Sequence, residues 1–312
     1  MMSKLYEKAR RKYRAFGLSV ISDFVLDDFL PGEEAAEIEI VRGKVPDEIR
    51  EPLKKNDFFQ LSKREFLLKI DGVAKFLVSE GKRIVIEPCP EADNLKLNSY
   101  IYGTCFEVLL IQRGMLALHG SAVVIDGKCI IISGVSGAGK STLALALREM
   151  GYPFLTDDVA FLSLSDDDTI WVCPGFPVHK LRRDSVETIG INMQSISQIY
   201  LNNQDKCVMR VKYGYQKAPV QLFALLELRS ETCNQVSMTR LDGMQKLSVL
   251  FNHTFRGSFL SLLSMEVANF RKHVSIAGKI YVYRVIRPKN TFTLEKQIKL
   301  ILQELKELTN VK

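Results

Sequence analysis

The 312-residue chain lacks the features that mark membrane, secreted and metal-stapled proteins. It has no uninterrupted apolar run of the roughly 18 residues that a membrane-spanning helix needs. Its basic first residues are not followed by the apolar segment of a secretory signal. Its six cysteines are widely spaced, with no CxxC pair and no histidine at ligand spacing. These absences argue against a disulfide scaffold and a zinc site, and they predict a cytoplasmic chain without membrane association.

The composition is that of an ordinary globular protein, with 46% hydrophobic and 25% charged residues. The net charge is +7, and the basic excess lies entirely after residue 108. Such an excess suits a phosphate-bearing ligand or an acidic partner, although a merely basic surface would give the same count. No nucleic-acid-reading motif accompanies it, so we expect no nucleic-acid partner.

The first third of the chain predicts a smaller α+β domain over 1–108, for which substrate docking is a hypothesis. The apolar spacing of four in 4–16 favours a helix. Strand-like stretches follow at 18–26 and 36–42, and Asp71-Gly72 marks a hairpin within 65–87. We expect a small, largely antiparallel sheet here.

The remainder, 109–312, predicts an α/β domain with a mixed sheet. A helix over 97–112 leads to strands at 121–125 and 128–133, which are joined by Asp126-Gly127. The later elements expected are helices at 140–150, 243–251 and 294–308, and strands at 154–162 and 279–286.

The sharpest motif is Gly134-Val135-Ser136-Gly137-Ala138-Gly139-Lys140-Ser141, which fits G-x-x-x-x-G-K-[ST] without a mismatch. A buried strand precedes it and a good helix former follows it, which is the context that a phosphate-binding P-loop requires. Glycines let successive backbone N–H groups turn towards phosphate oxygens, and the helix start adds the positive end of its dipole. The predicted nucleotide-binding residues are Gly134, Ser136, Gly137, Ala138, Gly139, Lys140, Ser141 and Thr142.

Within this motif Lys140 supplies a charge for the β- and γ-phosphates, and the Ser141 hydroxyl is a candidate ligand for Mg²⁺. No guanine-reading N-K-x-D segment occurs, so adenine is the default base and ATP with Mg²⁺ the expected cofactor pair. The alternative is a glycine-rich turn with a purely structural role. The lysine and serine in register after a buried strand disfavour this alternative.

Asp157 and Asp158 follow the next apolar strand, which we expect to lie beside the strand that feeds the loop. Adjacent strand residues face opposite sides, so one acid alone should point at the phosphates unless the strand ends there. One acid could hold Mg²⁺ while the other accepts a hydroxyl proton. A single metal-binding acid with a turn-capping neighbour is the alternative. His119 is either a site residue or a hydrogen-bonded core histidine.

These segments resemble the C-terminal domain of the HPr kinase/phosphorylase family. The matching features are Arg113 followed by Leu118-His119-Gly120, Asp126-Gly127-Lys128, the glycine-rich motif, Gly151-Tyr152 and Thr156-Asp157-Asp158-Val159. The resemblance is strong over 113–165. The whole-chain layout, with Tyr13-Arg14-Ala15-Phe16-Gly17-Leu18 at the front, is similar to shorter HPr-kinase-like proteins of lasso-peptide biosynthesis.

The resemblance implies an HPr kinase/PEP carboxykinase-like P-loop fold in which Asp157 is the general base and His119 assists it. Ser141 and Asp158 would support the metal, although adjacency leaves open which aspartate takes which part. The rigid Pro174-Gly175 stretch is followed by cations, so we expect Lys180 or Arg182 to contact triphosphate or acceptor. Thr142 replaces the Glu usual in HPr kinases, and no E-I-R-G-L-G segment follows, which puts HPr as substrate and the reverse reaction in doubt.

The leading hypothesis is an ATP- and Mg-dependent serine kinase acting on a peptide or protein. The implied acceptor is the C-terminal serine of a lasso precursor peptide, and the family also allows a homo-oligomer. Two alternatives stay open, namely a kinase of a small hydroxylated metabolite and a non-catalytic ATP-binding sensor.

Overall fold

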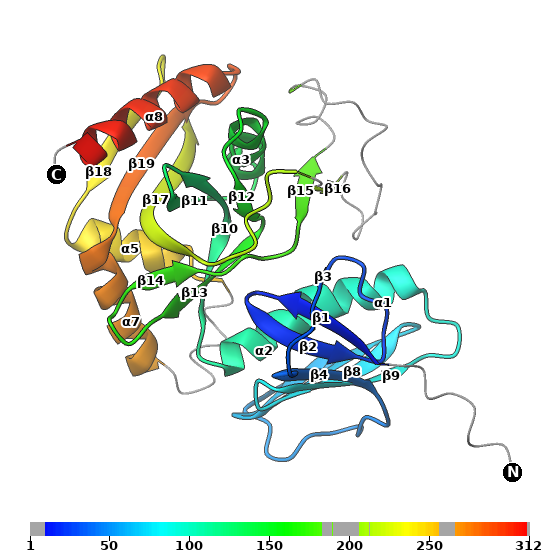
Figure 1. Cartoon of the computed structure of the whole chain (residues 1–312). Helices are drawn as coiled ribbons and strands as arrows, with labels where there is room; N and C mark the ends of the chain where they lie inside the picture. The colour runs from blue at the N-terminus through cyan, green and yellow to red at the C-terminus, as the bar shows by residue number, and fades with distance from the viewer. Residues whose placement is uncertain (1–9, 183–188, 190–205, 212, 256–265, 311–312) are drawn as a thin grey trace, which may run out of the picture. The chain divides into compact units, whose positions relative to one another are not determined.

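A computed structural model describes residues 10–182, 189, 206–211, 213–255 and 266–310 (Figure 1). The chain divides into two compact units. The first runs to Leu116 and also includes the start of a later helix, up to Asn269, and the second contains the remaining residues. The sequence places the division after residue 108, which lies inside helix α2 (Phe106–Gln112). Because α2 contacts strand β8 (Ala74–Ser79), the whole helix stays with the first unit.

The first unit contains a nine-stranded sheet of order β3-β1-β2-β4-β9-β8-β7-β6-β5. Besides β8, its strands are β1 (Arg11–Ala15), β2 (Leu18–Ser22), β3 (Leu30–Pro31), β4 (Ile38–Arg42), β5 (Lys54–Lys55), β6 (Phe59–Leu61), β7 (Glu65–Ile70) and β9 (Arg83–Pro88). The predicted hairpin at Asp71-Gly72 joins β7 to β8 and is confirmed. The sheet is larger than expected, and β4 runs parallel to both β2 and β9.

The helix predicted over 4–16 is wrong in its described part, because Arg11–Ala15 forms strand β1. Residues 1–9 lie outside the described part of the chain. Tyr13 and Ala15 are buried while Lys12 and Arg14 face solvent, which is the period of a strand. Phe16 and Gly17 have φ values of 51° and 78°, and this left-handed turn folds β1 back onto β2. Helix α1 (Asn94–Tyr100) and the π-turn η1 (Ile101–Cys105) precede α2, in the region predicted as one helix.

The second unit is built on a mixed eight-stranded sheet of main order β11-β10-β13-β14-β17-β19-β18. Strand β17 pairs with both β14 and β11, so the first five strands of this order close into a ring. The strands are β10 (Leu116–Ile125), β11 (Lys128–Gly134), β12 (Phe154–Thr156), β13 (Val159–Leu164), β14 (Ile170–Val172), β17 (Val220–Glu231), β18 (Ser237–Leu241) and β19 (Tyr281–Pro288). A separate ribbon pairs β15 (Val178–Arg182) with β16 (Lys206–Arg210). The mixed α/β class is confirmed.

Helices α3 (Lys140–Glu149) and α8 (Leu294–Asn310) pack their apolar sides on β11, β17 and β19. Their core includes Leu143 and Leu147 of α3 and Ile301 and Leu305 of α8, all at most 3% exposed. The predictions of helices α3, α8 and α5 (Met244–Asn252) and of strand β19 are confirmed. Helix α7 (Glu266–Lys279) was not predicted. The strand that follows α3 pairs with β10 and not, as expected, with β11, because β17 occupies the other edge of β11.

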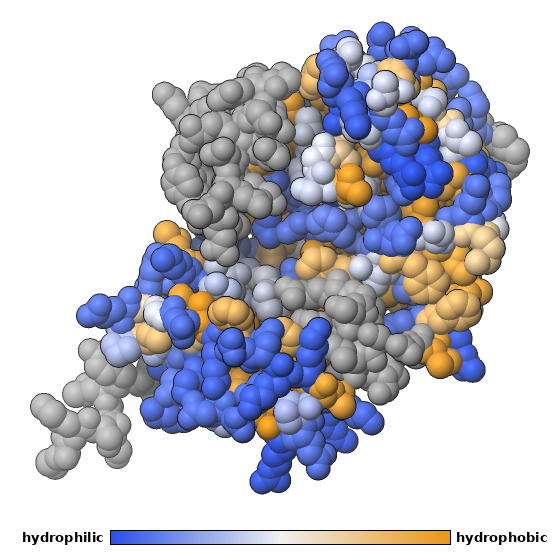
Figure 2. All heavy atoms as spheres, turned by 180° about the vertical axis from the view of Figure 1, so that it is seen from behind, coloured by the Kyte–Doolittle hydropathy of each residue, from blue (hydrophilic) through white to orange (hydrophobic). Residues whose placement is uncertain are grey.

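Among the described residues drawn in Figure 2, many surface side chains are hydrophilic, and apolar residues gather at one side. Val267, Phe270 and Val274 of α7 are 68%, 51% and 47% exposed. Among the described residues, no helix is both long enough and apolar enough to cross a membrane.

Candidate active site

The glycine-rich motif lies between β11 and α3, as the sequence predicts. Gly134 ends the strand with φ 144°, and a Cβ there would meet the Leu228 carbonyl oxygen of the adjacent β17 at 2.4 Å. Gly139 precedes the helix in the left-handed region, with φ 105°. The first N–H groups of α3 therefore open towards the loop without a side-chain cap, the arrangement that favours an anion.

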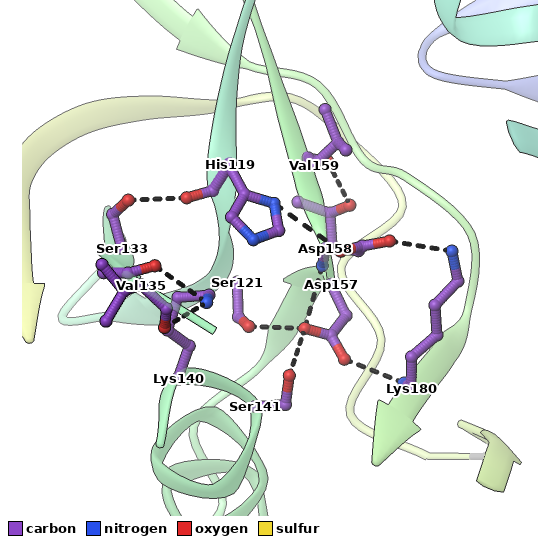
Figure 3. Close-up of polar contacts among 12 residues, drawn as sticks. His119, Ser121, Ser133, Val135, Lys140, Ser141, Asp157, Asp158, Val159 and Lys180 are labelled. Atoms are coloured by element: carbon purple, nitrogen blue, oxygen red, sulfur yellow. Dashed lines mark hydrogen bonds and ion pairs between the residues drawn. The ribbon is translucent and has the colours of Figure 1, made fainter. Parts of the chain in front are cut away.

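Lys140 and a residue from β19 fix the two sides of this loop. The Lys140 ammonium donates to the carbonyl oxygens of Gly134 and Val135 at 2.9 and 3.2 Å (Figure 3). The Arg287 guanidinium donates to the carbonyl oxygens of Ala138 and Gly137 at 2.9 and 3.3 Å. Arg287 follows Ala138 by 149 residues, and nothing in the sequence connects the two.

The two aspartates lie where the predicted strand breaks into β12 and β13. Asp158 has φ 72°, a left-handed conformation uncommon for a non-glycine residue. Its N–H donates to Oδ1 of Asp157 at 2.9 Å, and the Thr156 hydroxyl bonds to the Val159 carbonyl across the break. Because the strand is broken here, the two carboxylates do not have to point to opposite faces of one strand. They have different surroundings.

Asp157 is enclosed, with 1% of its side chain exposed. Its Oδ1 accepts hydrogen bonds from the hydroxyls of Ser121 and Ser141, and its Oδ2 accepts the Lys180 N–H at 2.9 Å (Figure 3). Nδ1 of the buried His179 lies 3.6 Å from Oδ2. Burial opposes ionisation, but His179, Ser121 and the Lys180 amide together hold the pKa of Asp157 well below its usual range.

Asp158 is one-third exposed and lies between two cationic or titratable groups. Its Oδ2 accepts a hydrogen bond from Lys180 Nζ at 3.0 Å, and its Oδ1 lies 3.6 Å from His119 Nδ1 (Figure 3). Burial and the Asp157 charge raise the pKa of Asp158, but Lys180 and His119 outweigh them and leave it below its ordinary value. Burial and the nearby Lys140 lower the pKa of His119, which favours the neutral ring.

A cavity of about 470 Å³ joins these groups within the second unit. Its lining includes the predicted site residues His119, Ser136, Gly137, Gly139, Lys140, Ser141, Thr142 and Asp158. Asp157 lies behind this lining, and Ala138 is fully buried in the core. Of the two predicted cations Lys180 lines the cavity, whereas Arg182 ends β15 and its side chain lies outside the described part of the structure.

Sequence analysis missed several residues of this site. Ser121 stands two positions after His119 on β10, so strand alternation could have placed both on one face. Leu181 and a run from the end of β19 to the first turn of α8 also line the cavity, without any motif to mark them. That run consists of Arg287, Thr291, Phe292, Thr293, Leu294 and Gln297.

A buried charge cluster underlies the site on β17. Glu227 is 3% exposed and accepts hydrogen bonds from Arg284 and Arg229 at 2.7 and 2.9 Å. His253 Nε2 lies 3.4 Å from the same carboxylate, and the His253 carbonyl accepts the N–H of His119. The cluster therefore braces the strand that carries His119.

Comparison with known proteins relates part of the chain to HPr kinase/phosphorylases. The enzyme of Treponema pallidum (strain Nichols) is 38% identical over 85 residues, which are 27% of this chain and 26% of that protein. The enzyme of Burkholderia lata is 27% identical over 158 residues, 48% of each protein. The chain thus spans between a quarter and a half of the length of these relatives.

A solved structure, the Hpr(Ser) kinase/phosphatase from Coxiella burnetii, matches with a TM-score of 0.33 and 13% identity over 62% of this chain and 93% of that one. No family model matches. The sequence matches alone relate the chain, at modest identity, to HPr kinase/phosphorylases. The relation to HPr kinase/phosphorylases agrees with the family that the motifs indicate, whereas the lasso-peptide branch is not reached by these matches.

Proposed function

We propose that this chain is an ATP- and Mg-dependent kinase that phosphorylates a serine hydroxyl of a peptide or protein. One observation carries the proposal. A single cavity contains a glycine-rich loop with the lysine and serine of a P-loop, and a half-buried aspartate that faces the same space. Phosphoryl transfer needs little more than a positioned triphosphate, positive charge around it and a group that takes the hydroxyl proton.

We assign the proton acceptor to Asp158 and not to Asp157, which reverses the assignment implied by the family resemblance. Asp158 lines the cavity, whereas Asp157 is enclosed and its oxygens already accept several hydrogen bonds. A general base must lie within hydrogen-bond reach of the proton that it takes. The neutral His119 ring beside Asp158 would orient this carboxylate.

Asp157 and Ser141 fit the metal site. A carboxylate and a hydroxyl are hard oxygen donors, and Mg²⁺ bound with a nucleotide takes one or two carboxylates together with phosphate oxygens and water. When bound, the ion would neutralise charge on the β- and γ-phosphates.

In the transfer step, the serine oxygen bonds to the γ-phosphorus as the bond from this phosphorus to the bridging oxygen of ADP breaks. Asp158 takes the hydroxyl proton. Lys140 and Lys180 supply fixed positive charge for the phosphoryl oxygens. Lys180 is held by Asp158 at 3.0 Å, so it stands at the point where donor and acceptor would meet.

The acceptor is a peptide or protein by analogy with relatives whose name specifies a protein, HPr. The narrower acceptor, the C-terminal serine of a lasso precursor peptide, rests on the resemblance of the segment Tyr13–Leu18, which forms the β1–β2 turn region. The first unit is then a candidate docking domain. A small hydroxylated metabolite is the competing acceptor, because any alcohol that reaches Asp158 could react.

The test is transfer of γ-³²P from ATP to a peptide that ends in serine, with an otherwise identical peptide that ends in alanine as control. We expect labelling of the serine peptide alone, and Asp158→Asn should lower kcat at least 100-fold while ATP binding persists. Free serine and the peptide should be compared at equal concentration. ATP binding without transfer to any acceptor would favour the sensor and contradict the proposal.

A further inference from the structure

We infer that the segment Thr291–Gln297 forms a subsite for the planar base of the nucleotide, with Phe292 as its stacking surface. The inference rests on the proposed binding of a nucleoside triphosphate and deepens it. The cavity has two chemically different walls. One is charged and contains His119, Asp158 and Lys180, whereas the other comes from the β19–α8 connection and presents an aromatic ring, hydroxyls and an amide.

Phe292 is the first reason for the assignment. Its side chain lines the cavity and is 60% exposed, so an apolar ring is open to a ligand in that space. Thr293 and Gln297 line the same cavity and are only 8% and 4% exposed, and we call these two buried polar residues the floor of this wall. A planar aromatic base stacked on Phe292 would remove this apolar surface from water, and such stacking does not require a particular base.

The second reason is where this wall is attached. Arg287, four residues before Thr291, donates to the carbonyl oxygens of Gly137 and Ala138 in the glycine-rich loop. The wall is therefore anchored to the loop that would hold the phosphates. Because the γ-phosphate must reach Asp158, the nucleoside extends from the loop away from the charged wall, and the β19–α8 wall receives it.

The third reason is that the floor carries both hydrogen-bond donors and acceptors. Gln297 Nε2 donates to the Thr293 hydroxyl at 3.2 Å, and the Gln297 N–H donates to the Thr293 carbonyl in the first turn of α8. An amide and a hydroxyl held in this way can bond to the edge of a base. This arrangement would be superfluous for phosphate, which the cations and the loop amides already suit.

The experiment compares ATP with inorganic tripolyphosphate, which has the phosphate chain but no base. Calorimetric titration of the full chain with Mg²⁺ should show that ATP binds more tightly than tripolyphosphate. Phe292→Ala should weaken ATP binding about tenfold and change tripolyphosphate affinity less than twofold. Phe292→Tyr, which keeps an aromatic ring, should restore ATP affinity.

Phe58→Ala is the matched control, because Phe58 is 62% exposed and lies in the other unit. Equal affinities of ATP and tripolyphosphate for the wild type would overturn the subsite while leaving phosphate binding intact. If Phe292→Ala leaves ATP affinity unchanged but raises the KM for the peptide, this wall binds the acceptor and not the base. That result would also overturn the proposed base subsite. If neither probe binds the wild type, the proposed function itself fails.

Discussion

The Ser141 hydroxyl, at the start of α3, lies 3.0 Å from Oδ1 of Asp157, sixteen residues further along the chain. This contact joins the glycine-rich loop to the break between β12 and β13. It puts the hydroxyl and the carboxylate that we propose as metal donors side by side. Asp157 is thereby a structural residue of the loop as well as a candidate ligand.

Asp157→Ala should abolish the gain in ATP affinity that Mg²⁺ confers, and leave metal-free ATP binding within about twofold of the wild type. It should also lower the free energy of unfolding by roughly 1–3 kcal/mol, because Ser121 and the Lys180 N–H lose a buried acceptor. Calorimetry with and without Mg²⁺, and urea unfolding, measure the two effects. Asp166→Ala, at an exposed position, is the control. A preserved Mg²⁺-dependent gain would remove Asp157 from the metal site.

Lys180→Met should shift the acidic limb of the pH–rate profile to higher pH. The Lys180 ammonium lowers the pKa of Asp158, and a base must be unprotonated to act. Without that ammonium, burial and the Asp157 charge raise this pKa, so activity is lost earlier as the pH falls. The measurement is kcat/KM against pH, with Lys289→Met, at an exposed lysine, as control. An acidic limb that stays in place would show that Asp158 is not the titrating base.

Glu227 should make the stability of the second unit depend on pH in the acid range. Burial opposes ionisation, but hydrogen bonds from His253, Arg229 and Arg284 lower the pKa of Glu227 to about 2. Because this pKa is lower in the folded than in the unfolded chain, ionised Glu227 stabilises the fold at pH values above its unfolded pKa, near 4.5. This stability is lost as the pH falls towards about 2. At 1.36 kcal/mol per pKa unit, the contribution at neutral pH is about 3 kcal/mol.

Glu227→Gln should therefore unfold at lower urea concentration at pH 7 and show a flatter dependence of stability on pH between about 4.5 and 2. Glu231→Gln, at the exposed end of the same strand, should behave like the wild type. Parallel pH curves for Glu227→Gln and the wild type would contradict the assignment of this acid-range stability to the cluster.

Two glycines of the loop should respond differently to alanine. At Gly134 a Cβ would meet the Leu228 carbonyl oxygen at 2.4 Å, so β11 and β17 would have to separate. We expect Gly134→Ala to destabilise the protein by roughly 3 kcal/mol. At Gly137 the space is open and only the left-handed φ of 81° opposes a side chain, for roughly 1–2 kcal/mol. Urea unfolding of the two variants compares them, and equal losses would mean that the strand contact does not restrict Gly134.

Local sequence was a sufficient guide to many elements. Asp71-Gly72 and Asp126-Gly127 predict hairpins because few other residues adopt the backbone that tight turns need. Helices α3 and α8 follow from one apolar face with period 3.6. The helix predicted over 4–16 failed because it was inferred from Leu5, Ala9 and Tyr13 at spacings of four, and three positions are too few to exclude a strand. The structure shows alternate burial of Tyr13 and Ala15 on β1 instead.

The candidate site divides in the same way. The order of glycines, lysine and serine determined that a glycine-rich turn lies between a strand and a helix, here β11 and α3, since that property belongs to the backbone and to adjacent residues. Only the tertiary structure decided which aspartate is enclosed and which faces the cavity, because the difference comes from Ser121, His179 and Lys180 on other strands. Likewise, Arg287 reaches the loop and Phe292 reaches the cavity through the packing of β19 and α8. Contacts between residues so far apart in the chain leave no periodic signal in the sequence.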